Sequence, residues 1–462
     1  MKKIIVVGLF LILSASNVGA QSDNMLEYDL FMEQVRENHP LSKKASLLVS
    51  SAEAAVLEAK GGFDPVLGFK RSDKNFTGID YYDKNSASLT VPLPFGPDIY
   101  AATERAVGTY LDPEASRGTV SYIGVDIPLL KGLWMDERRA SLRMATQYLK
   151  QSEQERLVAF NAVASAAAQS YWMWLETYQL WQITEGTLQL AQQRQNLLRT
   201  LQINGDRSEA DTIEVAVQVG QLRLLRDERR NAHRNATVAL TAHVWDEDIY
   251  DGLITGKLVP ATKWQVFDET TIQLWLADNN PESNPAMRWY DFKLAALGIE
   301  KKYKQQGLLP ELNLSTRLLS KNFYEFKGID QYYFADNYTM GISFKMPLFL
   351  RQGRGALQRT KLKMLETTLD RETKRRELTN KSTVLANDLM LINAQLADIA
   401  NLIVSQTRLF NLETSRFNLG ESSVFLVNTR EQKLLELRGK QIELTAKKAM
   451  VLTKINELRA AF

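Results

Sequence analysis

Two long segments without helix breakers constrain this chain more than any other feature of its sequence. Residues 136–204 contain no proline and one glycine, Gly186, and a second helical segment spans residues 355–419. At about 1.5 Å per residue, a helix over the first segment is about 100 Å long. The other predicted helices are about half as long, so two must stack end to end to cover one long helix. They span residues 25–60, 208–243, 285–306 and 422–460.

Apolar residues in these helices recur with the spacing of a coiled coil. In the second long helix they follow a strict 3-4 spacing, at Leu389, Ile392, Leu396, Ile399 and Ile403. In the last helix they recur every seven residues, at Leu437, Leu444, Val451 and Leu458. We expect both rows to form seams between packed helices.

The chain repeats one order of parts. An interval of 25 residues separates Pro40 from Pro65, and the same interval separates Pro285 from Pro310. Each copy then continues with strand-like alternation, a Pro-Leu turn, a long helix, a glycine turn and a shorter helix. The sequence therefore predicts two repeats around a mixed equatorial segment at residues 244–284. The repeats span residues 21–243, with strands within 66–128, and residues 285–462, with strands within 308–349.

Four segments alternate between apolar and polar residues with the period of a strand. In residues 337–349 the apolar row is Tyr338, Met340, Ile342, Phe344 and Met346. Similar rows lie in residues 87–93, 123–127 and 312–318. Packing of these rows on one another would make an ordinary soluble sandwich, which is one interpretation of the strands alone.

The N-terminus favours a membrane instead. Lys2 and Lys3 precede an apolar run over residues 4–13 and a small-residue cleavage pattern that ends at Ala20, so residues 1–20 are predicted to be a signal peptide. No later segment is predicted to be a transmembrane helix. Exported two-faced strands of about ten residues at one end of long helices indicate a membrane-spanning barrel, which must close because lipid cannot satisfy the hydrogen bonds of a sheet edge. Four to six strands are too few to close a barrel with a bore, so several copies of the chain must contribute their strands to one barrel.

Composition gives no support for catalysis or nucleic-acid binding. The net charge is +3, from 57 basic and 54 acidic residues, without a polybasic run. The absence of cysteine excludes a disulfide framework, a thiolate metal site and a lipidated N-terminal cysteine. The three histidines are far apart in sequence, and the carboxylates are scattered. We therefore predict no enzyme, no catalytic residue, no metal and no cofactor.

Two segments have competing interpretations. The aromatic residues of 161–181 could form a stacking platform for a ligand, but their helical spacing favours packing between helices. The acids Asp246, Glu247, Asp248 and Asp251 faintly resemble a calcium loop, but the spacing is wrong and favours a solvated acidic loop.

This order of parts resembles the TolC family of outer-membrane efflux proteins. Its local signatures here are residues 309–312 (LPEL), which open a strand, residues 347–349 (PLF), which close one, and residues 416–436 at the second helix turn. The resemblance implies a mainly α fold with a β-barrel portion. Three copies would pool strands into a twelve-stranded barrel in the outer membrane of a Gram-negative bacterium, continuous with a coiled-coil tunnel through the periplasm.

The resemblance also implies function and partners. The homotrimer would be the passive exit duct of a tripartite efflux pump or type I secretion system, driven through a periplasmic adaptor by an inner-membrane transporter of the RND, ABC or MFS class. It would contact outer-membrane lipid and no nucleic acid. The alternative is an exported periplasmic coiled-coil scaffold or adaptor without a pore.

Within that resemblance, particular residues receive roles. The glycine turns at Gly205 and Gly420 would dock the adaptor. A gate at the periplasmic tips would involve Asp206, Asp211, Arg416, Phe417 and Glu421, and lipid would contact Leu312, Leu314, Met340, Ile342 and Phe344. The interval from Pro65 to Pro128 is 63 residues, whereas that from Pro310 to Pro347 is 37, and we place the 26 extra residues of the first repeat in a longer extracellular hairpin near residues 94–118.

Overall fold

The computed structural model describes residues 24–111, 116–264, 269–278, 280–321 and 337–462. The predicted signal peptide lies outside these residues. The chain divides into two compact units, which are described separately. The hairpin unit comprises the chain up to His39, Ala164–Glu269 and Asn387–Lys454, and the sheet unit comprises Pro40–Val163, Thr270–Ala386 and Ile455–Phe462.

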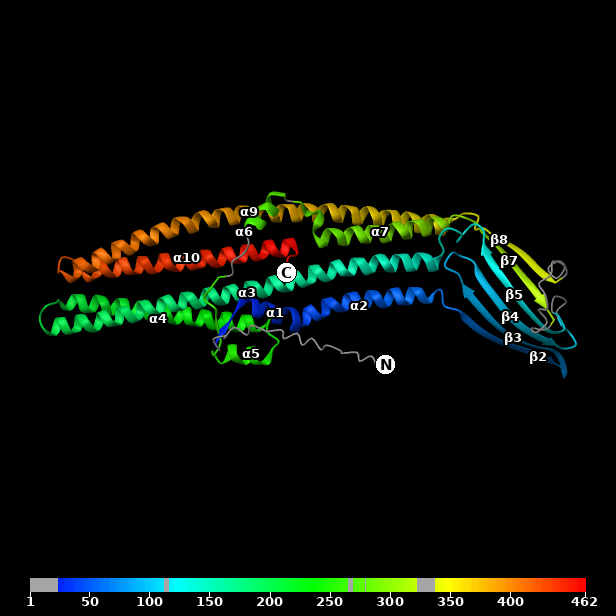
Figure 1. The fold of residues 1–462 in the computed structure, drawn as a ribbon, viewed down its shortest axis with the longest axis horizontal. Helices are drawn as coiled ribbons and strands as arrows, with labels where there is room; N and C mark the ends of the chain where they lie inside the picture. The colour runs from blue at the N-terminus through cyan, green and yellow to red at the C-terminus, as the bar shows by residue number, and fades with distance from the viewer. Residues whose placement is uncertain (1–23, 112–115, 265–268, 279, 322–336) are drawn as a thin grey trace, which may run out of the picture. The chain divides into compact units, whose positions relative to one another are not determined.

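The sheet unit is built on six antiparallel strands in the order β2-β3-β4-β5-β7-β8 (Figure 1). Helix α2 leads into β2, α3 follows β5, α7 leads into β7, and α9 follows β8. The strands are β2 (Val66–Phe76), β3 (Ile79–Pro92), β4 (Asp98–Val107), β5 (Gly118–Pro128), β7 (Glu311–Ser320) and β8 (Tyr338–Lys345). The helices are α2 (Pro40–Gly61), α3 (Glu137–Ile203), α7 (Pro285–Gln306) and α9 (Arg351–Asn418).

The number of strands differs from the expectation. The segment near residues 94–118 was expected to be an extracellular hairpin, but it contains β4, which pairs with β3 and β5 along its length. On both faces of β4, Ala and Thr are mixed with charged residues, so its sequence shows only a weak alternation between apolar and polar positions. Three copies would need four strands each to make a twelve-stranded barrel, whereas this sheet has six strands within the described residues.

The register gives the sheet two different faces. Paired residues share a face, so the row Phe69, Ala87, Thr103 and Ser121 continues across four strands. Tracing all the pairs puts every apolar row on one face, called here the apolar face. Lys70, Ser86, Glu104 and their neighbours lie on the opposite, polar face.

Ion pairs join the strands to the helices that follow them. Arg138, near the start of α3, binds Asp98 of β4 at 2.8 Å. Arg139 donates to the carbonyl oxygen of Phe95 in the β3–β4 turn at 3.3 Å. Lys131 binds Glu311 of β7 at 2.6 Å. These contacts hold the segment that leads into α3, and its first turn, against strands from both sequence repeats.

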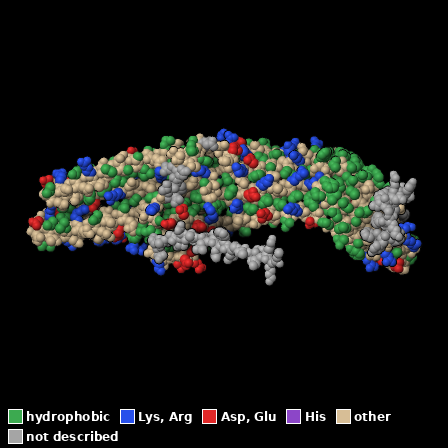
Figure 2. Space-filling view, viewed as in Figure 1, with side chains coloured by type: hydrophobic (Ala, Val, Ile, Leu, Met, Phe, Trp, Pro, Cys, Tyr) green, Lys and Arg blue, Asp and Glu red, His purple; other side chains and the backbone are tan. Residues whose placement is uncertain are grey.

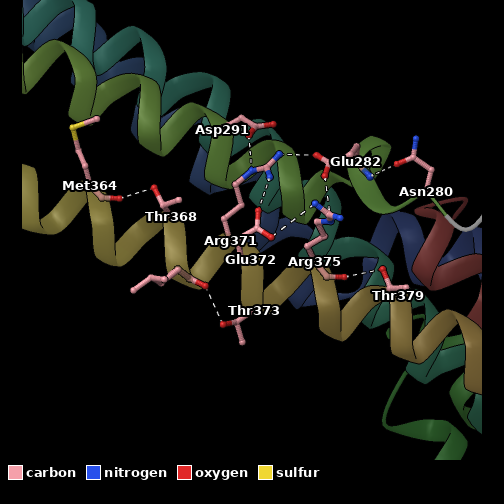
Figure 3. Close-up of polar contacts among 11 residues, drawn as sticks. Asn280, Glu282, Asp291, Met364, Thr368, Arg371, Glu372, Thr373, Arg375 and Thr379 are labelled. Atoms are coloured by element: carbon pink, nitrogen blue, oxygen red, sulfur yellow. Dashed lines mark hydrogen bonds and ion pairs between the residues drawn. The ribbon is translucent and has the colours of Figure 1, made fainter.

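An arginine on α9 clamps α7 and the turn before it (Figure 3). Nε of Arg371 donates to Asp291 of α7 at 2.9 Å, and its Nη2 donates to Glu282 at 2.6 Å. Glu282 lies in the short helix η1 (Pro281–Ser283), which follows α6 (Glu269–Asp278). Arg375, one turn further along α9, lies 3.9 Å from the same carboxylate. A forked guanidinium can bind both acids at once, so Arg371 fixes where α7 begins.

The hairpin unit contains two helical hairpins and a small layer beside them. Helix α3 pairs with α4 (Glu209–Thr241), and α9 pairs with α10 (Val424–Arg459). The two hairpins share a core that includes Leu198, Val219, Phe417, Val424 and Val427. The layer contains α1 (Tyr28–Asn38), α5 (Glu247–Ile254) and a parallel pair of short strands, β1 (Met25–Leu26) with β6 (Val259–Pro260).

The aromatic cluster of α3 packs in this unit rather than forming a ligand platform. Tyr171, Trp172 and Trp174 are fully buried. The ring of Trp172 stacks on Tyr28 with centroids 4.5 Å apart, and its Nε1 donates to Thr453 of α10 at 2.9 Å. The hydroxyl of Tyr171 donates to a backbone oxygen at 2.9 Å. Packing between helices was the favoured interpretation of these residues, and the structure confirms it.

Three local expectations need correction. The predicted helix over residues 25–60 is broken at His39, because Pro40 disfavours helical geometry at the preceding residue. The acidic loop is helix α5, where Asp246 caps the N-terminus by accepting from the backbone N–H of Ile249. His39 and His243, far apart in sequence, have ring centroids 5.8 Å apart. Among the described residues, however, no three acidic or histidine side chains form a metal-binding cluster.

The predicted heptad rows are buried seams. Leu389, Ile392 and Ile399 of α9 are buried, as are Leu444 and Val451 of α10. By length and composition alone, α9 also contains one window apolar enough to cross a membrane, the single case among the described helices. Only 17% of that window is buried in the single chain, so the buried seam covers a small part of it.

Replacing Trp172 with alanine should destabilise the hairpin unit by about 3–5 kcal/mol, because a large buried ring and its hydrogen bond are lost. The adjacent Met173 is 47% exposed, so Met173→Ala is the matched control and should change stability by less than about 1 kcal/mol. The check is the thermal midpoint of the purified protein in detergent, and equal midpoints for the two variants would contradict the assigned core.

Candidate functional site

The apolar face of the sheet is exposed in the single chain. Figure 2 shows hydrophobic side chains gathered over the strands. On β8, Met340, Ile342 and Phe344 are 60–66% exposed, and on β2 Leu67 and Phe69 are exposed further still. Leu312 and Leu314 of β7 pair with Phe344 and Ile342. All five residues predicted to contact lipid therefore lie on this one face: Leu312, Leu314, Met340, Ile342 and Phe344.

Exposed aromatic rings lie at both ends of the strands. Phe95, Trp134 and Phe349 stand in the connections at the helix end of the sheet, and all three are exposed. At the other end, Phe76 and Tyr110 flank Tyr81, with the Tyr81 and Tyr110 centroids 4.9 Å apart. Strands of 8 to 14 residues between two rows of aromatic rings have the length and borders of strands that span a membrane, which need about 9–11 residues.

The polar face carries charged and hydroxylated side chains. Arg317 of β7 lies over the ring of Tyr100 at 5.0 Å and 3.9 Å from Asp126. Towards the β2–β3 turn, a hollow of about 580 Å³ is lined by three lysines and one acid: Lys70, Lys74, Lys84 and Glu104. This face is suited to water rather than to a protein core.

The two hairpins of the other unit end in the same backbone motif. Gly205 and Gly420 both have φ of +81°, the left-handed conformation that favours glycine. The N–H of Asp206 donates to Leu201 at 2.8 Å, and the N–H of Glu421 donates to Arg416 at 2.9 Å. This is the Schellman arrangement that ends a helix. A side chain added at either glycine would meet nothing within 4 Å, so both tips are open.

The tips are connected by a pair that the sequence did not reveal. Arg207 lies over the ring of Phe417 at 4.3 Å and donates to its backbone oxygen at 2.8 Å. Phe417 is buried in the shared core. This predicted gate residue therefore packs between the two hairpins, and Arg207 closes over it. The two residues are 210 positions apart, and no local pattern links them.

The other predicted gate residues are not brought together. Asp211 lies in the first turn of α4, where its backbone N–H donates to the hydroxyl of the N-cap Ser208 at 3.3 Å and its Oδ2 accepts from that hydroxyl at 3.0 Å. Asp206, Arg416 and Glu421 are exposed at the turns. Within the described part of the chain, these three side chains form no ion pair. Their charge is available to a partner or to other copies.

A buried ion pair fixes one hairpin against the other. Arg194 of α3 binds Glu431 of α10 through two contacts of 2.8 and 3.0 Å. Gln218 of α4 donates to the same carboxylate at 2.9 Å, and Arg194 also donates to Asn428. The Glu431 side chain is only 6% exposed. Breaking such a pair from one side leaves a buried charge, so the pair specifies how the hairpins align.

A cavity of about 350 Å³ lies among α3, α4 and α10, lined by leucine, isoleucine, threonine and glutamine side chains together with four charged residues, Arg229, Glu436, Lys440 and Glu443. The nearby Glu176 carboxyl interacts with three of these charges. The pKa of Glu176 is raised to about 7, first by burial and then by the nearby Glu443, while Arg229 and Lys440 oppose the shift. Glu176 therefore takes up a proton near neutral pH.

Comparison with known proteins identifies the fold. No protein-family model matches the chain, and no curated protein matches its sequence. The outer-membrane channel OprN is 12% identical over 94% of this chain and 90% of its own, with a TM-score of 0.64. The outer-membrane protein VceC of Vibrio cholerae is 13% identical over 93% of this chain and 95% of its own, with a TM-score of 0.64. The CmeC outer-membrane channel of Campylobacter jejuni is 15% identical over 93% of this chain and 84% of its own, with a TM-score of 0.62.

The chain therefore has the fold of bacterial outer-membrane channels. More particularly, this is the TolC-like fold, which the resemblance in sequence had predicted. At these identities the likeness concerns the fold alone.

Glu176→Gln should make stability less dependent on pH. Because the folded-state pKa of Glu176 lies above its ordinary value near 4.5, the native state of the wild type loses stability as pH rises from about 4.5 to 7. The variant should be more stable than wild type at pH 8 by about 1–2 kcal/mol, a value reduced for partial solvent access, and nearly equal at pH 4.5. Thermal midpoints at the two pH values test this. Glu228→Gln, at an exposed position of α4 outside the cavity lining, is the control, and a constant difference across pH would contradict the assignment.

Proposed function

We propose that three copies of this chain form an outer-membrane efflux channel that acts as a passive exit duct. The observation that carries the proposal is the exposed apolar face of the sheet, with a polar face behind it and aromatic rows at both strand ends. Lipid would cover the apolar face, and the polar face would line a water-filled lumen. In a chain with the fold of outer-membrane channels, the apolar face would contact lipid and the polar face would contact water.

Apolar rows on the helices support the assembly of several copies. On α9 within the hairpin unit, Leu391, Leu402 and Leu409 are 43–53% exposed, separate from the buried heptad row. Within the sheet unit, Leu362, Leu365 and Leu369 are exposed with 3-4 spacing. A second heptad row on a long helix is suited to another helix, and neighbouring copies would supply it.

The open glycine tips are the proposed contact with a periplasmic adaptor. Two identical Schellman turns leave backbone exposed where a partner can approach closely. An inner-membrane transporter would drive the substrate, and the channel itself would catalyse no reaction. A periplasmic scaffold without a pore would explain the heptads, but it would leave the apolar face of the sheet in water.

Charge on the apolar face should prevent membrane assembly. Ile342→Asp places a carboxylate against lipid at a cost of about 2–3 kcal/mol per copy, whereas Ser343→Asp, one residue along β8, faces the lumen. We expect heat-sensitive trimers in the outer-membrane fraction for wild type and Ser343→Asp, and a strong loss for Ile342→Asp. Equal assembly of both variants would contradict the lipid assignment, and a soluble wild-type monomer would overturn the channel.

A bulky residue at the second tip should reduce export without disrupting the trimer. Gly420→Trp adds a large side chain where the adaptor is proposed to dock, and its left-handed φ costs only about 1–2 kcal/mol. Export of a pump substrate should fall several-fold while trimers remain. Gly186→Ala, a change inside α3 with open space around it, is the control. Normal export by the Gly420 variant would remove the docking assignment.

A further inference from the structure

The two outermost strands of the sheet have unpaired backbone edges. Strands β2 and β8 stand at the ends of the strand order, so within the described residues each is hydrogen-bonded to one neighbour only. Every residue of β8 is exposed, and β2 is exposed over most of its length, whereas β3 and β5 are mostly half-buried. In lipid, a row of unpaired N–H and C=O groups is not tolerated.

The directions of these two edges match. All five pairings in the sheet are antiparallel, and there are six strands, so β2 and β8 run in opposite directions. The β8 edge of one copy can therefore pair antiparallel with the β2 edge of an identical copy. Such a contact joins two different surfaces head to tail, and it closes into a ring when the rotation allows.

The faces match as well. In the traced register, Ile342 and Phe344 of β8 share the apolar face with Leu67 and Phe69 of β2. Ser343 shares the polar face with Lys70 and Ser72. Pairing β8 with β2 in a register that keeps this parity extends the apolar surface and the polar surface without interruption.

We propose that β8 of each copy pairs with β2 of the next, and that the wall of the channel contains all six strands of every chain. This rests on the proposed trimer, for which three copies of a six-stranded sheet give eighteen strands rather than twelve. Barrel diameter grows roughly linearly with strand number, so the bore would be about half as wide again. The proposal predicts a channel that passes bulkier cargo at the membrane than a twelve-stranded wall would allow.

Disulfide cross-linking tests the seam, because the chain has no cysteine of its own. Ser343→Cys is combined in turn with Val66→Cys, Lys70→Cys and Ser72→Cys, all on the polar face. After mild oxidation of assembled protein in membranes, at least one pair should give covalent dimers and trimers under denaturing, non-reducing conditions. Ser343→Cys with Phe69→Cys, on the opposite face, is the matched control and should give none.

Two further pairs detect a twelve-stranded wall. If β2 and β3 lay outside it, β8 would meet β4 of the next copy, and Ser343→Cys with Tyr100→Cys would cross-link between chains. If β3 and β4 lay outside it, β2 would meet β5, and Lys70→Cys with Tyr122→Cys would cross-link within a chain. In the six-strand wall, β2 and β5 are three spacings, or about 14 Å, apart, too far for a disulfide.

The outcomes separate this proposal from the function on which it rests. Cross-linking of β8 to β2 between copies, with neither of the other two links, supports the eighteen-stranded wall. Either alternative link, or trimers that form without a β8–β2 link for any pair, overturns it while leaving the channel intact. Absence of trimers in the cysteine-free parent overturns the proposed function itself.

Discussion

Two requirements of the six-stranded sheet govern the rest of the protein: its apolar face must be covered, and its outer strands must be paired. Its apolar face is exposed in the single chain, and the outer edges of its two end strands have no partner among the described residues. Lipid can cover the first, but only another strand can satisfy the second, because hydrocarbon offers no hydrogen bonds. The same sheet therefore accounts for both parts of the proposed assembly, the membrane and the additional copies. The exposed heptad rows on α9 fit that assembly, since further copies would cover them.

The hairpin unit combines a specific interior with open tips. Arg194 and Glu431 form a buried ion pair across the hairpins, and Arg207 covers Phe417 near the turns. These contacts define how the hairpins align. The glycines beyond them have no neighbours to hold a side chain. A rigid interior below an exposed backbone turn is suited to docking, because a partner can bind the turn without disturbing the core.

Local rules of sequence predicted much of this fold. Helix α7 spans the predicted residues because Asn284 caps it and Pro285 occupies its first turn. The heptad rows and the β8 alternation were readable because each depends on a single period. Strand β4 was missed because its rows are mixed and its apolar residues are small, so partners on both sides, rather than its own pattern, make it a strand. Of the predicted gate residues, Phe417 packs in the shared core of the single chain and Asp211 bonds to the helix cap Ser208, and the gate itself stays a prediction.

The sequence by itself determined most of the elements, their order and the two-faced character of most strands, because these follow from spacing along the chain. Only the tertiary structure decided which elements meet. It placed β4 between β3 and β5, joined Arg207 to Phe417 across 210 positions, and brought His39 beside His243. Among the described residues it also gave the large sheet six strands, and with them the width of any barrel that the copies could close. Such pairings depend on packing between distant segments, for which no local periodicity exists.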